Sequence, residues 1–206
     1  MLDYFALLEE PRRPWIDPDT LKRKFFALSA DLHPDRVHAS GETELAAANR
    51  NFADLNAAWQ CLREPKERLG HLLELELGAR PKDTQDVTPA AMELFFEVGQ
   101  LCREADGFLS AKARTASPLL QAQMFGQGMA LSERLAALRQ RIQGRREELL
   151  GALQDLNAAW GSAPPPGSPG RAGALALDRL EGIYRMFSYL ARWSGQIQER
   201  VVQLSF

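Results

Sequence analysis

The sequence is poor in the residue types that build most catalytic and metal sites. Its 206 residues include two cysteines, Cys61 and Cys102, and three histidines, and the cysteines are too far apart to form a CxxC pair. No glycine-rich phosphate-binding loop is present. We therefore expect two free thiols on helices, no catalytic residue, no bound metal and no cofactor.

The sequence also lacks long apolar runs and a strong charge of either sign. No run of 18 apolar residues occurs, and Met1-Leu2-Asp3 does not resemble the start of a signal peptide. The formal net charge of −2 argues against bulk nucleic-acid binding, which needs a basic surface. We expect a cytoplasmic protein that binds neither membranes nor nucleic acid. Its 45% hydrophobic and 25% charged residues are typical of a folded globular chain of one large or two small domains.

The most informative stretch is Leu32-His33-Pro34-Asp35-Arg36, which lies between two segments with helical periodicity. The first segment begins at Asp17-Pro18, a helix cap followed by a first-turn proline, and Pro34 ends it because proline disfavours helix before it. Its apolar stripe is Leu21, Phe25, Leu28 and Leu32. The stripe of the second segment is Leu45, Ala48, Phe52, Leu55, Trp59 and Leu62. Two such stripes joined by a polar loop predict an antiparallel helical hairpin that displays His33, Pro34 and Asp35 at its tip.

Three other interpretations of His33 are open. It could be an ordinary solvated loop histidine. It could bind a metal together with Asp35 and His38, although no cysteine lies near these residues. It could act with Asp35 as an acid–base pair, but no nucleophile accompanies them. We favour a contact surface for a partner that carries out the chemistry.

The flanking residues strengthen this interpretation. Asp3 to Leu8 resemble the short first helix of a J domain, the module that stimulates the ATPase of DnaK-type chaperones. Leu55 to Leu62, followed by Glu64-Pro65 and Arg68, resemble the end of its third helix and the start of its fourth. The resemblance implies that the histidine tripeptide contacts the chaperone and that basic residues beside it dock on an acidic groove. The implied chaperone-binding residues are His33, Pro34, Asp35, Arg36, Lys22, Arg23 and Lys24. At helical spacing the side chains of Lys22, Arg23 and Lys24 are expected to fan across the solvent side of the first segment. Asp31 departs from the family, which often has a basic residue there.

Breaks in composition divide the chain into two domains. Residues 1–77 hold four short helices and form the expected J domain. Residues 78–87, which contain Gly78 and Pro81, form the expected linker. Residues 88–206 contain three long amphipathic segments, which predict an antiparallel three-helix bundle and an all-α protein. Near-heptad spacing leaves coiled-coil dimerisation as an alternative.

The first segment of the bundle carries apolar residues on two opposite faces. One stripe contains Leu94, Val98, Leu101, Ala105 and Phe108 and should pack on the neighbouring helices. Met92 and Phe96 lie on the opposite side, edged by Glu93, Glu97 and Gln100, and this arrangement favours a protein-docking patch. The alternative is that another helix covers them.

A J domain followed by such a bundle is similar to the HscB-type co-chaperones of iron–sulfur cluster assembly. In that family the bundle binds the scaffold protein IscU and delivers it to HscA or another DnaK-type chaperone. The resemblance implies that Met92, Phe96, Glu97, Gln100 and Tyr189 bind the scaffold, and Tyr189 is expected on an outward face because it lies two residues beyond the stripe residue Phe187. Glu93 departs from the family by placing a carboxylate where an apolar residue is usual.

Two segments look reshaped relative to the family. Residues 116–130 read as an altered connection between the first two bundle helices, and residues 161–173 read as a long flexible loop rich in proline and glycine. The tetracysteine metal domain of some relatives is absent.

The function expected from the sequence is that of a non-enzymatic co-chaperone. It would bind IscU and stimulate ATP hydrolysis by a DnaK- or HscA-type chaperone. One alternative keeps the J domain but delivers a different client. A second alternative is a metal-binding or redox protein that uses His33, Asp35, His38, Cys61 and Cys102.

Overall fold

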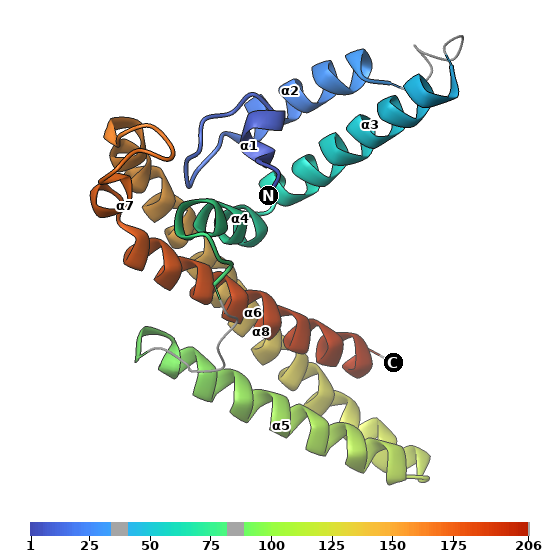
Figure 1. The fold of residues 1–206 in the computed structure, drawn as a ribbon. Coiled ribbons are helices and arrows are strands. Elements are labelled where there is room, and N and C mark those ends of the chain that lie inside the picture. Colours follow the sequence, from blue (N-terminus) through green and yellow to red (C-terminus); the bar gives the residue numbers. More distant parts are fainter. Residues whose placement is uncertain (34–40, 82–88, 206) are drawn as a thin grey trace. The chain divides into compact units, whose positions relative to one another are not determined.

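The computed structural model describes residues 1–33, 41–81 and 89–205, and every element assigned within these ranges is helical (Figure 1). The predicted tripeptide residues Pro34 and Asp35, and Arg36 beside them, lie outside the described residues. The elements are α1 Tyr4–Leu7, α2 Pro18–Asp31, α3 Glu42–Arg63, α4 Pro65–Leu77, the 3-10 turn η2 Pro89–Ala91, α5 Met92–Arg114, α6 Pro118–Ser162, α7 Arg171–Ala174 and α8 Leu177–Leu204. The expected all-α class is confirmed.

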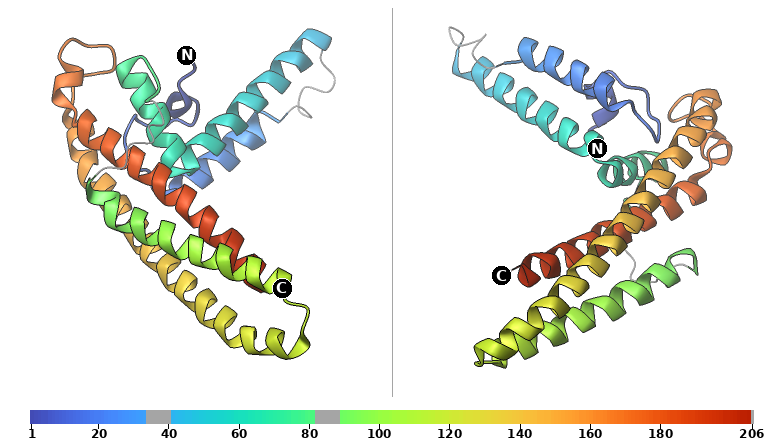
Figure 2. Two further views of the ribbon diagram at one scale, coloured as in Figure 1. Left: turned by 90° about the horizontal axis from the view of Figure 1, so that it is seen from below. Right: turned by 180° about the vertical axis from the view of Figure 1, so that it is seen from behind.

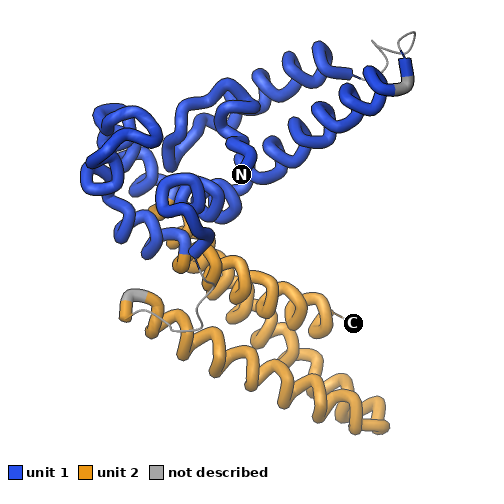
Figure 3. The backbone as a smooth tube through the Cα atoms, in the orientation of Figure 1, with its two compact units in different colours: residues 1–82, 150–184 blue, residues 83–149, 185–206 orange. Residues whose placement is uncertain are grey.

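The chain forms two compact units, each with its own core (Figure 3). Unit 1 comprises residues 1–82 and 150–184, and unit 2 comprises residues 83–149 and 185–206. The boundaries fall inside α6 and α8, so both helices contribute to both units. The division into a J domain of residues 1–77, a linker of residues 78–87 and a bundle of residues 88–206 remains a prediction.

In unit 1, α1 and α2 both pack on α3, and α2 and α3 lie side by side (Figure 2). Phe5, Leu8, Leu21, Leu55 and Leu62 are almost fully buried in this core. Asp17 caps α2, since its carboxylate accepts a 2.8 Å hydrogen bond from the backbone N–H of Thr20. The predicted hairpin stripes therefore meet where Leu21, Leu55 and Leu62 are buried, whereas the stripe residues Leu32 and Leu45 at the other end of the hairpin are exposed, which the spacing did not predict.

The last part of unit 1 comes from the C-terminal half of the chain. Asn157 exchanges two hydrogen bonds with the backbone of Trp15, at 3.0 and 2.9 Å. Buried Arg68 donates to the carbonyls of Pro14 and Leu62, at 2.9 and 2.7 Å. These contacts join the segment before α2 to α4 and to the end of α6.

In unit 2, parts of α5, α6 and α8 pack side by side as three long helices. Val98, Leu101, Ala105, Leu135 and Ile197 are among the buried side chains. Charged pairs bridge the helices at the surface, including Arg134 with Glu104 at 2.5 Å and Arg200 with Asp106 at 2.8 Å.

The structure corrects one expectation about α6. Residues 118–130 are not a connection, because α6 begins at Pro118 and only Thr115–Ser117 separate it from α5. α6 also continues without a break through Arg145-Arg146. Proline suits the first turn of a helix, and the glycines that suggested a loop are tolerated inside it.

The segment 161–173 is held against α4 within unit 1, although its composition suggested a flexible loop. Arg171 is only 6% exposed, donates to the carbonyl of Pro164 at 2.5 Å and forms an ion pair with Glu76. One buried arginine therefore fixes the proline-rich segment.

Candidate functional site

The first candidate site is the end of the α2–α3 hairpin, where His33 is exposed. α2 ends at Asp31, and the N–H of Leu32 closes the last turn by donating to the carbonyl of Leu28 at 2.9 Å. The ring of His33 lies 5.4 Å from that of Phe52 on α3, edge to face. This contact places the exposed imidazole against α3.

Apolar side chains are exposed along the same hairpin. Phe26 is 58% exposed, and Leu32 and Leu45 are 38% and 37% exposed. A shallow hollow beside His33 is lined by Leu32, Ala47 and Ala48, with Asp31 and Glu44 at its edge. Exposed apolar surface next to polar groups is typical of a protein contact region.

The basic residues of α2 do not all face solvent as predicted. Lys24 lies 2.7 Å from the carboxylate of Glu10, which is 1% exposed, and it donates to the carbonyl of Glu9 at 2.7 Å. Arg13 also pairs with Glu10, at 2.6 Å. The expectation that Lys24 fans out to solvent is therefore wrong, because α2 packs on the buried acid that follows α1.

Lys22 and Arg23 do lie on the exposed side of α2. Arg23 donates to the hydroxyl of Thr20 at 2.9 Å. The hydrogen bonds from Thr20, helped by the nearby positive charge of Arg23, lower the pKa of Asp17 below its ordinary value. Lys22 and Arg23 thus supply the positive charge on the exposed side of α2.

The second candidate site is the start of α5, where three large apolar side chains are exposed. Met92 and Phe95 are each 41% exposed and Phe96 is 63% exposed. The rings of Phe95 and Phe96 lie 5.5 Å apart, edge to face. The predicted residues Met92 and Phe96 therefore lie together, and Phe95 joins them. We call Met92, Phe95 and Phe96 the α5 patch.

Phe95 was missed in the sequence, although its position carried a signal. It lies three residues after Met92 and next to Phe96, so helical spacing places it at the edge of the same face. Phe95 directly follows Leu94 of the buried stripe, so the apolar spacing alone did not distinguish it from a buried residue.

Glu97 and Gln100 lie on the side of α5 that faces α6. Glu97 accepts from Arg141 of α6 through both carboxylate oxygens, at 2.6 Å each, and Glu93 is 3.5 Å from the same guanidinium. Gln100 lines a shallow hollow together with Glu97 and Arg141. Arg141 therefore balances the acids that edge the α5 patch.

Tyr189 is not on an outward face, and that expectation is wrong. It is 2% exposed and stacks on Trp193, with ring centroids 5.8 Å apart. Residues 186–190 are all buried, so no side of this turn of α8 is open. Trp193 in turn lies 6.5 Å from Phe95. Trp193 thus links Tyr189 to the α5 patch.

The described residues contain no group of three or more His, Cys, Asp or Glu side chains placed to hold a metal ion. Asp35 and His38 of the metal alternative lie outside the described residues. Cys61 is partly buried and Cys102 is buried, and burial raises the pKa of the Cys61 thiol to about 11. No helix in the described ranges is both long and apolar enough to cross a lipid bilayer.

These features define the chain as an all-α protein in which a J-domain hairpin is combined with a helical bundle that exposes an aromatic patch. No family model matches the chain. Its structure is similar to that of the chaperone HscB from Vibrio cholerae, with a TM-score of 0.63 and 19% identity over 98% of this chain and 99% of that one. It is also similar to human co-chaperone protein HscB, with a TM-score of 0.58 and 18% identity over 98% of this chain and 81% of that one. The chain therefore has the fold of HscB-type co-chaperones.

Proposed function

We propose that this protein is a cytoplasmic, non-enzymatic co-chaperone of iron–sulfur cluster assembly. Its hairpin end would engage a DnaK- or HscA-type chaperone and promote ATP hydrolysis. Its α5 patch would hold the scaffold protein IscU. Neither role requires a cofactor, a membrane or nucleic acid.

The observation that carries this proposal is the combination of the HscB fold with an exposed His33 at the end of α2, directly before Pro34-Asp35 in the sequence. One fold is compatible with many functions, so the function has to be inferred from the residues of the site. An exposed imidazole beside apolar surface, with Lys22 and Arg23 on the same helix, suits contact with an acidic protein surface.

The proposed client surface is supported by its exposure and by the buried aromatic side chain beside it. Phe95 packs near Trp193, which is only 4% exposed. Aromatic and methionine side chains are enriched in the cores of protein interfaces. In this proposal Met92 and Phe96 contact IscU directly, Glu97 and Gln100 form the polar rim, and Tyr189 positions the patch through Trp193.

Two surfaces on one chain would couple client loading to ATP turnover. A client held on the α5 patch has a raised effective concentration at a chaperone that is held by the hairpin. The chaperone ATPase should then respond more strongly to this protein and IscU together than to the sum of their separate effects.

Chaperone ATPase measurements test the proposal directly. The rate of ATP hydrolysis by purified HscA or DnaK is measured alone, with this protein, with IscU and with both. We expect stimulation by this protein and a greater-than-additive rate with both. No stimulation under any of these conditions would reject the co-chaperone function.

A different client for the same chaperone is the second candidate. It is favoured by Glu93, whose side chain is 88% exposed at a position that is usually apolar in the family. If IscU fails to bind while stimulation of the chaperone persists, this candidate replaces IscU delivery.

A further inference from the structure

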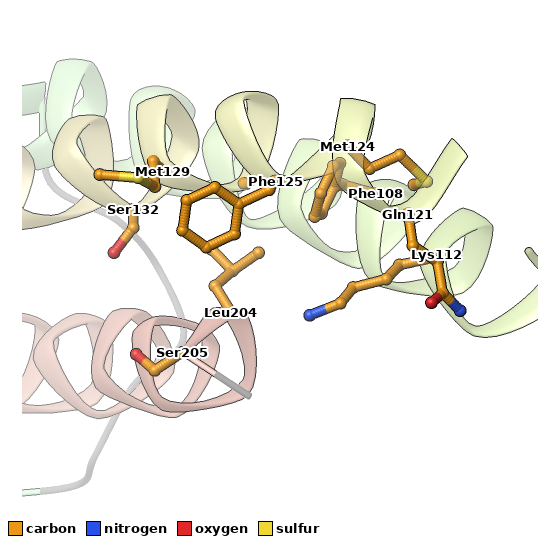
Figure 4. A pocket seen from close by; sticks show the side chains of 10 residues that line it. Phe108, Lys112, Gln121, Met124, Phe125, Met129, Ser132, Leu204 and Ser205 are labelled. Carbon is orange, nitrogen blue, oxygen red and sulfur yellow. The ribbon is translucent and has the colours of Figure 1, made fainter. Parts of the chain in front are cut away.

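A small apolar hollow lies at the other end of α5, among three helices of unit 2. Phe108 of α5, Phe125 and Met129 of α6 and Leu204 of α8 line it (Figure 4). Leu204 is the last residue of α8, so the end of that helix contributes to the hollow. Phe108 follows Phe96 by twelve residues, which is about 18 Å along a helix. The hollow is therefore distinct from the α5 patch.

Phe108 is partly buried and forms the floor of the hollow, whereas Phe125 and Met129 are exposed and form its rim. A side chain at Gly128 would come within 3.2 Å of two ring atoms of Phe108, so the ring lies close against the backbone of α6. On the rim, Phe125 is 69% exposed and Met129 is 51% exposed. A fixed aromatic floor with an exposed, adaptable rim is suited to receiving an inserted apolar group.

The size of the hollow favours a single side chain over a small-molecule ligand. Its volume is about 200 Å³, whereas sites for cofactors and drug-sized ligands usually have about 300–1,000 Å³. Its concave shape is also a poor match for a flat lipid surface, which would contact the rim and leave the floor uncovered.

The one charged side chain among the described residues that line the hollow is that of Lys112. From Gly107 to Ser132 the charged residues are Lys112 and Arg114, with no acid. The nearest acids on α5 are already paired, Asp106 with Arg200 and Glu104 with Arg134. Among the described residues Lys112 forms no ion pair. A symmetric dimer through this surface would bring like charges together, so a second copy is disfavoured.

We propose that this hollow is a second docking site, which binds an acidic amphipathic helix of a partner protein. One large apolar side chain of that helix enters between Phe108 and Phe125, and a carboxylate one turn away pairs with Lys112. The site is separate from the α5 patch. It gives the bundle a second partner, whose acidic side chains are opposite in charge to Lys112.

A displayed library of helical peptides tests the proposal on the full-length protein. Peptides are selected on the wild type and counter-selected on a Phe125→Ser/Lys112→Glu double variant. We expect the selected peptides to share a large apolar residue with Asp or Glu three or four positions away. Each single variant should weaken their binding at least tenfold, and raised salt should weaken it further.

A charge exchange and a matched control sharpen the test. Lys112→Glu should regain binding when the acidic residues of a selected peptide are replaced by lysine. Phe26→Ser removes another exposed phenyl group, from α2, and should leave peptide binding unchanged. Circular dichroism of all variants should match that of the wild type, because the altered side chains are exposed or line the surface.

Several results would overturn the proposal. Selected peptides without acids, or peptides that bind both single variants as well as the wild type, would contradict it. Self-association that Phe125→Ser abolishes would identify a second copy as the occupant. Binding to phosphatidylserine vesicles without any peptide selection would identify a lipid surface. The proposal does not depend on the co-chaperone function, because Phe125→Ser is expected to leave IscU binding and ATPase stimulation intact.

Discussion

Glu76 and Arg171 form a bidentate ion pair in unit 1, with N–O distances of 2.8 Å for both contacts. Their side chains are 4% and 7% exposed, and they lie 95 positions apart in the chain. Arg12 approaches Glu76 at 3.9 Å and also pairs with Asp3 at 2.8 Å. One buried carboxylate thus joins α4, the proline-rich segment before α8 and the region of α1.

Arg171→Ala should lower the free energy of unfolding by about 3 kcal/mol, since it leaves the buried Glu76 charge with only the distant Arg12. Urea denaturation followed by circular dichroism measures the change. Arg145→Ala is the control, because Arg145 pairs with Glu148 on the exposed side of α6 and its loss should cost less than about 1 kcal/mol. Equal effects of the two substitutions would show that the buried pair does not stabilise the fold.

Lys24 and Lys22 should differ in what they contribute. Lys24→Ala should lower stability by about 1–2 kcal/mol, because it removes a charged partner of buried Glu10. Lys22→Ala should leave stability unchanged and weaken the binding of the DnaK-type chaperone, more so at low salt. Denaturation and chaperone titration of both variants check this. A stable Lys24→Ala protein with a severe chaperone defect would reverse the assignment.

The α5 patch should supply most of the affinity for IscU. Replacing Phe96 by Ser, or Met92 and Phe96 together, should raise the dissociation constant. Each side chain that becomes buried on binding contributes about 1.5–3 kcal/mol to the binding free energy. Calorimetric titration with IscU measures the loss of affinity. The same titration with Phe95→Ser measures the contribution of Phe95, which was not predicted from the sequence.

Tyr189→Phe provides the contrast within the same region. The ring remains stacked on Trp193 and only a hydroxyl group of a 2% exposed side chain is lost, so we expect a change in affinity of less than about threefold, which corresponds to about 0.7 kcal/mol. An effect as large as that of Phe96→Ser would mean that Tyr189 contacts the client itself.

His71 should make unit 1 less stable in mild acid. Its Nε2 accepts the backbone N–H of Tyr4 at 3.1 Å, and its ring lies against Tyr4 and Phe5. Burial lowers its pKa below the ordinary 6.5, and positive Arg12 and Arg80 act in the same direction, whereas Asp3 and Glu74 oppose it. The unfolded chain therefore binds the proton more readily than the folded chain.

The sign of the pH effect follows from this difference. The contribution is fully present above pH about 6.5, the unfolded pKa, and is lost as the pH falls towards the lower folded pKa. Unfolding experiments between pH 7.5 and 5 should show a smaller pH dependence in His71→Gln, whose amide oxygen can still accept the N–H of Tyr4. An unchanged dependence would exclude His71 as the titrating group.

Helices and their buried faces were predictable because the apolar spacing is regular and because caps and prolines mark the ends. Asp17-Pro18 begins α2 as expected, and Val98, Leu101 and Ala105 are buried as their stripe predicted. Residues 118–130 were misread because glycines inside a helix resemble a loop when packing is unknown. The ring of Phe108 against Gly128 is a tertiary contact that no local pattern reveals.

The site residues were predictable where exposure depended on one helix alone. Met92 and Phe96 are exposed because they lie opposite the buried stripe of their own helix. Tyr189 and Lys24 were misplaced because their surroundings come from other elements: Tyr189 stacks on Trp193 within a fully buried turn, and Lys24 meets Glu10, fourteen residues earlier. A helical period defines faces, but it does not specify how many of those faces are covered.

The most direct test of the account is the chaperone ATPase rate with the His33→Gln variant. We expect this substitution to abolish stimulation of the DnaK-type chaperone, while circular dichroism and IscU titration remain those of the wild type, because His33 is exposed and lies in the other unit from the α5 patch. Stimulation that persists in His33→Gln, or a parallel loss of IscU binding, would contradict the division of the protein into a chaperone surface and a client surface.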